Sequence, residues 1–267
     1  MAYLETDSGH RVHYDRFSGE GGTMVLVHGW GMSGEYWNST VEALVTNGYG
    51  ALVVDHRGCG LSDRDFPDLS LRAIAGDVAA IVGACGLSRV VLNGWSLGGA
   101  VVVEAASLLG NTVGGIVLTC GATPRYTQAP DFKHGGQAED VLANQAAITA
   151  NRADFFRGLA QGAVAEGTSA AIVDWLERGF LASGACASRT LADLAHLDQR
   201  DTLASLDCPV LSIGGKQDGI VDPAIAEVAA NCARDGRLEM LDTGHSPQLE
   251  QPEAYHDLIV DFMGSVR

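Results

Sequence analysis

The chain has 267 residues, enough to bury the core of one large domain or of one domain with an insertion. Hydrophobic residues make up 46% of it and glycines number 34, which is typical of a globular enzyme and excludes a disordered or fibrous chain. The net charge of −16 would repel nucleic acid and anionic membranes, so we expect neither as a partner. The oligomeric state stays open.

Six cysteines are scattered along the chain without a Cys-x-x-Cys pair or a nearby histidine cluster, which argues against a zinc site. Cys85, Cys120 and Cys208 lie in or beside apolar runs, as buried thiols do. The first residues show neither a basic n-region nor an apolar h-region, and no apolar run reaches membrane-spanning length. We therefore expect a reduced, cytoplasmic protein with no metal and no cofactor.

Apolar runs bounded by glycine-rich loops predict strands that alternate with helices over most of the chain. The predicted strands are residues 3–6, 11–17, 23–27, 51–54, 89–93, 113–120, 209–213 and 237–241. The predicted helices outside the middle of the chain are 35–45, 100–109, 221–232, 252–263 and one that Ser70 caps and that runs to Cys85-Gly86. This alternation predicts an α/β fold with a mostly parallel central sheet flanked by helices.

The middle of the chain has a different character. From residue 125 to about 205 the buried β-runs disappear, alanine becomes frequent and helical spacing takes over. The helices predicted here are 138–150, 153–164, 169–181 and 189–206. We interpret residues 125–205 as an inserted helical cap, which leaves 1–124 and 206–267 as the core.

A glycine-flanked serine stands between a β-branched run and an apolar helical run. Gly94-Trp95-Ser96-Leu97-Gly98 matches G-x-S-x-G, the turn that presents a nucleophile between a strand and a helix. The glycines leave room on both sides, so the Ser96 hydroxyl can stand above the sheet. Because the helix begins at the serine, its N-terminal amides favour negative charge that develops there. Ser96 is therefore the candidate nucleophile.

A serine hydroxyl needs a histidine to take its proton and a carboxylate to orient that histidine. Asp218 follows the strand that ends at residue 213, and His245 follows the strand 237–241, so both should lie at the same sheet edge as Ser96. The order Ser96, Asp218, His245 is the nucleophile–acid–base order of α/β-hydrolases. Asp222 is the nearest rival acid, and His28, the closest competing histidine, is interpreted as a structural turn residue.

Acyl transfer also needs amides aimed at the carbonyl oxygen as it becomes an oxyanion. We expect one amide from Leu97, directly after the nucleophile, and the other from Trp30 in the loop that follows the strand 23–27. The side chains of Trp30 and Trp95 are candidates for the wall of the substrate pocket, with a buried structural role as the alternative for each.

Five motifs together resemble the α/β-hydrolase superfamily across nearly the whole chain. They are HGWG at 28–31, DHRGCGLS at 55–62, GWSLGG at 94–99, QDGIVDP at 217–223 and GHSPQLEQPE at 244–253. Within the superfamily, the first and third look most like those of the pimeloyl-[acyl-carrier protein] methyl ester carboxylesterases. The resemblance implies Ser96, Asp218 and His245 as a catalytic triad, with Trp30 and Leu97 as the oxyanion hole.

The named esterases act on a substrate carried by an acidic protein, through basic groups on the cap. The predicted cap here holds seven basic residues against ten acidic ones, on a protein of net charge −16. Such a surface is a poor dock for an acidic carrier protein, so we do not expect that partner.

The leading hypothesis is a serine hydrolase that cleaves a small to medium, mostly apolar carboxylic ester or lactone through an acyl-enzyme on Ser96. A second hypothesis keeps the triad but uses it for carbon–carbon bond hydrolysis, perhydrolase or cofactor-free oxygenase chemistry. A third, from another class, is a hydrolase-fold receptor that binds a ligand, which multiple-turnover kinetics would separate from an enzyme. Dehalogenases and epoxide hydrolases are disfavoured because they use an aspartate where Ser96 stands.

Overall fold

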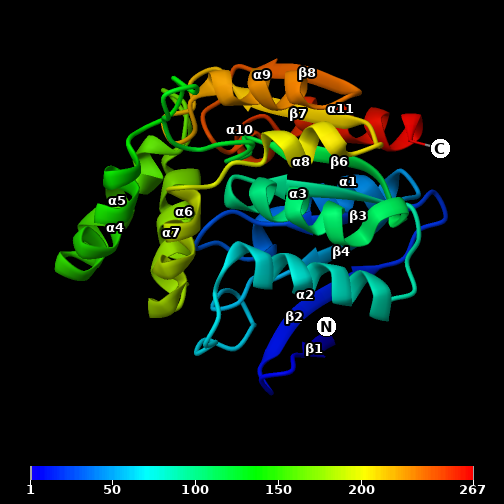
Figure 1. The fold of residues 1–267 in the computed structure, drawn as a ribbon, viewed down its shortest axis with the longest axis horizontal. Helices are drawn as coiled ribbons and strands as arrows, with labels where there is room; N and C mark the ends of the chain where they lie inside the picture. Colours follow the sequence, from blue (N-terminus) through cyan, green and yellow to red (C-terminus); the bar gives the residue numbers. More distant parts are fainter. Residues whose placement is uncertain (1, 267) are drawn as a thin grey trace.

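The structure, a computed structural model, describes residues 2–266 and contains one eight-stranded sheet in the order β1-β2-β4-β3-β5-β6-β7-β8 (Figure 1). β2 runs antiparallel to both of its neighbours, and the pairs from β4 through β8 are parallel. The strands are β1 (Ala2–Glu5), β2 (Arg11–Phe17), β3 (Thr23–Val27), β4 (Gly50–Val54), β5 (Val90–Trp95), β6 (Val113–Thr119), β7 (Val210–Gly215) and β8 (Gly236–Leu241). The predicted mostly parallel sheet and its opening hairpin are confirmed.

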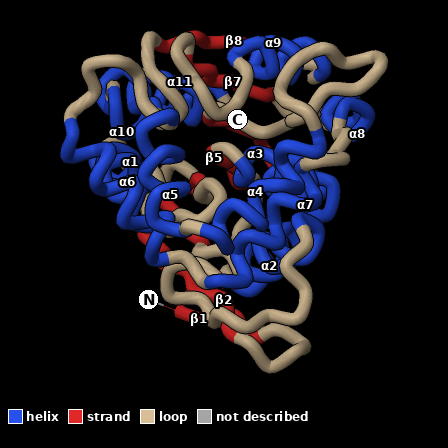
Figure 2. Tube along the Cα trace, turned by 90° about the vertical axis from the view of Figure 1, so that its left-hand side faces the viewer, coloured by secondary structure: helices blue, strands red, loops and turns tan. Residues whose placement is uncertain are grey.

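Helices cover both faces of this sheet, as Figure 2 shows with the strands between two helical layers. α1 (Asn38–Thr46) packs against α11 (Pro252–Ser265) on one face, and α2 (Leu71–Ala84) packs against α3 (Leu97–Leu109) on the other. α9 (Pro223–Cys232) lies against β7 and β8. Because the central strands β4, β5 and β7 are buried along their whole length, their sequences are dominated by apolar residues, with Asn93 and Ser212 as polar exceptions.

Ser70 caps the N-terminus of α2, as predicted. The Ser70 side chain accepts a hydrogen bond from the backbone N–H of Ala73 at 3.2 Å, and the helix begins at Leu71. This bond satisfies one of the N–H groups that the first turn of a helix leaves without an intrahelical partner. Leu71, Ile74 and Val78 then form part of the buried face.

The chain between β6 and β7 carries a separate set of helices. They are α4 (Ala138–Ala150), α5 (Arg152–Gly162), α6 (Ala170–Ala182), η3 (Ala185–Thr190), α7 (Leu191–Leu194) and α8 (Arg200–Ser205). α4 to α7 stand beyond one end of the sheet (Figure 1), whereas α8 packs against α3 and α9. The division into a core and a cap at residues 125 and 205 stays a prediction.

The single helix predicted over 189–206 is wrong, because the chain leaves helical geometry between α7 and α8. The Ala195 carbonyl accepts a hydrogen bond from Thr127 Oγ1 at 2.8 Å, and the Gln199 N–H donates instead to the Pro124 carbonyl at 2.8 Å. The Gln199 amide also bonds Thr123 Oγ1 and the Ala100 carbonyl. These bonds to distant backbone replace the helical bond that would join Gln199 to Ala195.

The remaining elements are short: η1 (Gly34–Trp37), η2 (Gly110–Thr112) and α10 (Pro247–Glu250). Within residues 2–266, no helix has the length and apolar character needed to cross a membrane.

Candidate active site

Ser96 stands at a sharp turn between β5 and α3. Its backbone has a φ of 57° and a ψ of −121°, and residues other than glycine rarely adopt such a positive φ. An added Cβ at Gly94 would lie 2.1 Å from the Gly98 carbonyl oxygen, and one at Gly98 would lie 2.3 Å from the Val27 carbonyl oxygen. Both glycines are therefore required for the chain to make this turn against β3.

His245 and Asp218 meet in a buried hydrogen bond. His245 Nδ1 lies 2.7 Å from Asp218 Oδ2, and the two residues are 5% and 9% exposed. The other carboxylate oxygen of Asp218 accepts bonds from the N–H groups of Ile220 at 2.8 Å and Val221 at 2.9 Å. A carboxylate held this way keeps Nδ1 protonated, which leaves His245 Nε2 as the basic nitrogen.

Asp222, the rival acid, is engaged elsewhere. Its Oδ1 accepts the N–H of Ala224 at 3.0 Å and thereby caps α9, and its Oδ2 accepts the N–H of Gly135 at 3.1 Å. The carboxylate that reaches His245 is that of Asp218.

Ser96 and His245 line the same cavity of about 70 Å³, which lies between the sheet edge and helices α4 to α7. Its walls are almost entirely apolar and aromatic. Trp30, Trp95 and Phe180 face it, together with Tyr126, Phe155, Leu159, Leu176, Leu191, Leu194 and Ile220. The two tryptophans also have structural bonds, because Trp30 Nε1 donates to the Ala187 carbonyl and Trp95 Nε1 donates to the His245 carbonyl. Each tryptophan therefore both lines the cavity and has a structural role.

Two backbone amides near Ser96 are free to bind a ligand oxygen. Among residues 2–266, the N–H groups of Trp30 and Leu97 donate to no protein acceptor. The loop that carries Trp30 lies close to the serine, since a Cβ added at Gly29 would be 3.2 Å from Ser96 Cβ. Leu97 is the first residue of α3, so its N–H is one that the helix cannot satisfy.

Comparison with known proteins identifies the family of this chain. The sequence model of the alpha/beta hydrolase family matches residues 24–258. The chain belongs to the alpha/beta hydrolase family. The predicted α/β-hydrolase fold is thereby confirmed.

Relatives of this alpha/beta hydrolase have more than one chemistry. A pimeloyl-[acyl-carrier protein] methyl ester esterase of Sodalis glossinidius is 31% identical over 90% of this chain and 92% of its own. A non-heme haloperoxidase of Rhodococcus erythropolis is 28% identical over 90% of each chain. Among solved structures, an esterase of Exiguobacterium antarcticum superposes with a TM-score of 0.93 at 22% identity, covering 98% of both chains.

His28 is a buried structural residue that links two loops of this hydrolase, in line with its interpretation as a structural turn residue. Its Nδ1 lies 2.7 Å from the Gly29 carbonyl, and its Nε2 accepts the N–H of His56 at 2.9 Å. The two rings stack with centroids 3.9 Å apart. Burial lowers the pKa of His28 and lowers that of His56 further, so both rings stay neutral and hold the loops after β3 and β4 together.

One cluster near the site was missed from the sequence. Cys120, directly after β6, places its sulfur within 4.8 Å of the ligand atoms of Asp218 and His245. Burial, followed by the charge of Asp218, raises the pKa of this thiol well above its usual range. A thiolate, an imidazole and a carboxylate are zinc ligands, but here the imidazole and the carboxylate are already hydrogen-bonded to each other through His245 Nδ1 and Asp218 Oδ2.

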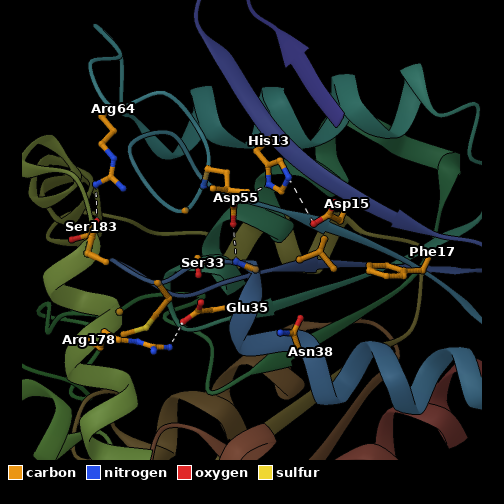
Figure 3. A pocket seen from close by; sticks show the side chains of 17 residues that line it. His13, Asp15, Phe17, Ser33, Glu35, Asn38, Asp55, Arg64, Arg178 and Ser183 are labelled. Carbon is orange, nitrogen blue, oxygen red and sulfur yellow. Dashed lines mark hydrogen bonds and ion pairs between the residues drawn. The ribbon is translucent and has the colours of Figure 1, made fainter. Parts of the chain in front are cut away.

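A second, larger cavity of about 500 Å³ lies between β2, η1 and α6. Figure 3 shows His13 between Asp55 and Asp15 on one wall, with Nδ1 2.8 Å from Asp55 and Nε2 3.7 Å from Asp15. Arg178 bonds Glu35 at 3.1 Å on the opposite side. Asp55 also accepts the N–H groups of Gly34 and Leu61, so it fixes the loops around this cavity. The cavity contains neither Ser96 nor His245.

Proposed function

We propose that this protein is a serine hydrolase that cleaves a carboxylic ester or lactone of a small, mostly apolar substrate through an acyl-enzyme on Ser96. The observation that carries the proposal is a shared cavity. Ser96, held in a strained turn, and His245, whose Nδ1 is bonded to Asp218, both line one apolar pocket. A base activates a serine when its basic nitrogen can reach the hydroxyl, and the shared pocket gives His245 and Ser96 a common space in which to meet.

In the proposed reaction, Ser96 Oγ attacks the carbonyl carbon of the ester while His245 Nε2 takes the hydroxyl proton. Asp218 holds the imidazole in the tautomer that can accept this proton, and it stabilises the imidazolium that results. The tetrahedral intermediate collapses when His245 returns the proton to the leaving alcohol. Water then attacks the acyl-enzyme with the same base, which releases the acid and restores Ser96.

The negative charge on the carbonyl oxygen needs donors that are already in place. The free N–H groups of Trp30 and Leu97 supply them in this proposal. Leu97 is the first residue of the 13-residue helix α3, so the positive end of the helix dipole reinforces its N–H. Removal of one such donor costs about 10²–10³ in kcat in other hydrolases, so these amides are an essential part of the proposal.

The cavity supports a short acyl group. Its volume of about 70 Å³ is far below the roughly 300–1,000 Å³ of pockets that hold drug-sized ligands. Aromatic and aliphatic side chains form its walls, and Tyr126, one of the few polar residues there, directs its hydroxyl to the Ile220 carbonyl at 3.1 Å. Such a pocket favours short hydrocarbon chains over charged groups, because a charge without a partner is costly to bury.

The test combines a substrate panel with active-site labelling. We expect kcat/KM for p-nitrophenyl esters to be highest for acyl chains of two to four carbons and to fall at least tenfold by eight carbons. A fluorophosphonate should form one covalent adduct, which peptide mapping places on Ser96, and Ser96→Ala should abolish both turnover and labelling. A label on another residue of an active preparation, or full activity of Ser96→Ala, would refute the proposal.

A second candidate function is perhydrolysis, which the haloperoxidase relative favours. The same acyl-enzyme is then attacked by hydrogen peroxide in place of water, and the product is a peracid. This route needs no further protein group, so the assay decides. Bromide oxidation that requires both a short-chain acid or ester and hydrogen peroxide, and that is lost in Ser96→Ala, would show this activity.

A further inference from the structure

Glu250 makes an unusual number of hydrogen bonds for a carboxylate that the proposed mechanism does not use. It lies at the end of α10, five residues after His245. Oε1 accepts the N–H of Ser246 at 3.0 Å, and Oε2 accepts the N–H of Gly244 at 3.0 Å. Oε2 also accepts the N–H of Ala165 at 2.7 Å and the Thr168 hydroxyl at 3.1 Å. The carboxylate therefore satisfies four donors from two segments.

The first two donors bracket the catalytic histidine. Gly244 N–H and Ser246 N–H lie on either side of His245, so one carboxylate fixes the backbone both before and after it. The His245 carbonyl accepts from Trp95 Nε1 at 2.7 Å, and the His245 N–H donates to the Ala163 carbonyl at 3.0 Å. The backbone at His245 is thus held from three directions, and Glu250 is the only charged group among these partners.

The other two donors belong to the chain that follows α5, within the predicted cap. This segment lies directly on the histidine loop, because a Cβ added at Gly244 would be 2.5 Å from the Val164 carbonyl carbon and 2.6 Å from the Ala165 nitrogen. No side chain separates the two backbones, and the Glu250 carboxylate joins them together with the backbone hydrogen bond from His245 to Ala163. The position of residues 163–168 is therefore tied to the position of His245.

We propose that Glu250 is a positioning residue, which holds His245 in register with Asp218 and Ser96 and fixes residues 163–168 of the predicted cap to the same loop. The role rests on the proposed function, in which His245 is the base. It also explains why the residue is a glutamate. All four partners are donors, and an ionised carboxylate offers acceptors alone, whereas a glutamine would turn its NH₂ group toward at least one of these donors.

The test compares Glu250→Gln and Glu250→Asp with the control Glu253→Gln. Glu253 is an exposed acid in the first turn of α11, so its substitution makes the same charge change three residues away. Glu250→Asp retains the charge but shortens the side chain by one methylene. Its carboxylate therefore cannot reach both the histidine loop and the chain that follows α5. Turnover is measured per active site titrated with a fluorophosphonate, which removes any effect of a smaller folded fraction.

We expect both Glu250 variants to lose roughly 10- to 100-fold in kcat with KM within about threefold, since small displacements of a catalytic group have effects of this size. Glu253→Gln should behave as the wild type. A kcat per titrated site within twofold of the wild type in the Glu250 variants, or an equal loss in Glu253→Gln, would overturn the assignment.

A second readout needs no ester turnover. The proton between His245 Nδ1 and Asp218 Oδ2 should give a strongly downfield NMR resonance, because the hydrogen bond is short and buried. We expect this resonance to shift or broaden in the Glu250 variants and to be retained in Glu253→Gln. An unchanged resonance in all three variants would overturn the positioning role. If the wild type cleaves no ester but the resonance still changes in the Glu250 variants, the positioning role is supported and the proposed function is refuted.

Discussion

Replacement of Asp218 by asparagine tests the proposed triad most directly, because the structure determines how the new side chain must sit. Oδ1 of Asp218 accepts the N–H groups of Ile220 and Val221, so an asparagine will keep its amide oxygen there. Its NH₂ group then faces His245 Nδ1, where Oδ2 now lies 2.7 Å away. The imidazole must accept a hydrogen bond at Nδ1 and carry its proton on Nε2, so it cannot take the proton of Ser96.

The expected loss in kcat is about 10⁴-fold, the effect of the wrong histidine tautomer in another triad, which corresponds to about 5.5 kcal/mol in the activation barrier. The two backbone bonds are kept, so we expect only a small change in Tm. Asp222→Ala should do the reverse. It removes the cap of α9 and the acceptor of the Gly135 N–H, which costs about 1–2 kcal/mol of stability and a few degrees in Tm. Its kcat should stay within a few-fold of the wild type.

The assay is kcat on a short p-nitrophenyl ester together with a thermal unfolding curve for each variant. The pair of measurements separates chemistry from folding, because each substitution is expected to move one quantity and spare the other. An active Asp218→Asn together with an inactive, normally stable Asp222→Ala would refute the proposed acid.

Two further predictions concern metals and pH. Ester cleavage should survive exhaustive chelation, since a serine and two amides supply the proposed chemistry. Loss of activity that zinc restores would contradict this mechanism and make the cluster of Cys120, Asp218 and His245 the candidate metal site. Burial lowers the pKa of His28 and His56, so the unfolded chain binds protons that the folded chain does not. Their contribution to stability is complete above about pH 6.5, the ordinary pKa of a histidine in the unfolded chain, and should be lost progressively as the pH falls below it. Urea midpoints between pH 8 and 5 would show this loss, and a midpoint that stays constant or rises toward pH 5 would contradict it.

The features that could be predicted from the sequence are those set by local geometry. Gly94 and Gly98 are required because the backbone of the Ser96 turn passes within 2.1–2.3 Å of where their Cβ atoms would be. Asp218 and His245 follow strands β7 and β8, and parallel strands bring their carboxyl ends to one edge of the sheet. Strand ends and permissive glycines therefore identified the candidate residues without knowledge of the side-chain packing.

The features that could not be predicted depend on partners far along the chain. The break between α7 and α8 exists because Thr127 and Pro124, about 70 residues earlier, bind groups that a continuous helix would use. Glu250 was missed for the same reason, since half of its donors lie about 85 residues away in Ala165 and Thr168. A periodic pattern or a motif describes neighbours in sequence, so it contains no information about such contacts.

The same distinction explains why chemistry was easier to infer than substrate. The groups proposed to react lie at the sheet edge, but much of the pocket wall comes from α4 to α7, where packing decides which way each side chain points. Phe180 of α6 stacks on Phe156 of α5 with centroids 5.5 Å apart, and its ring lies 5.9 Å from that of Trp30. Trp30 is held from the same side by the Ala187 carbonyl. The residue proposed to donate to the oxyanion therefore rests against the wall of the proposed substrate pocket, so we expect a change in that wall to alter kcat as well as KM.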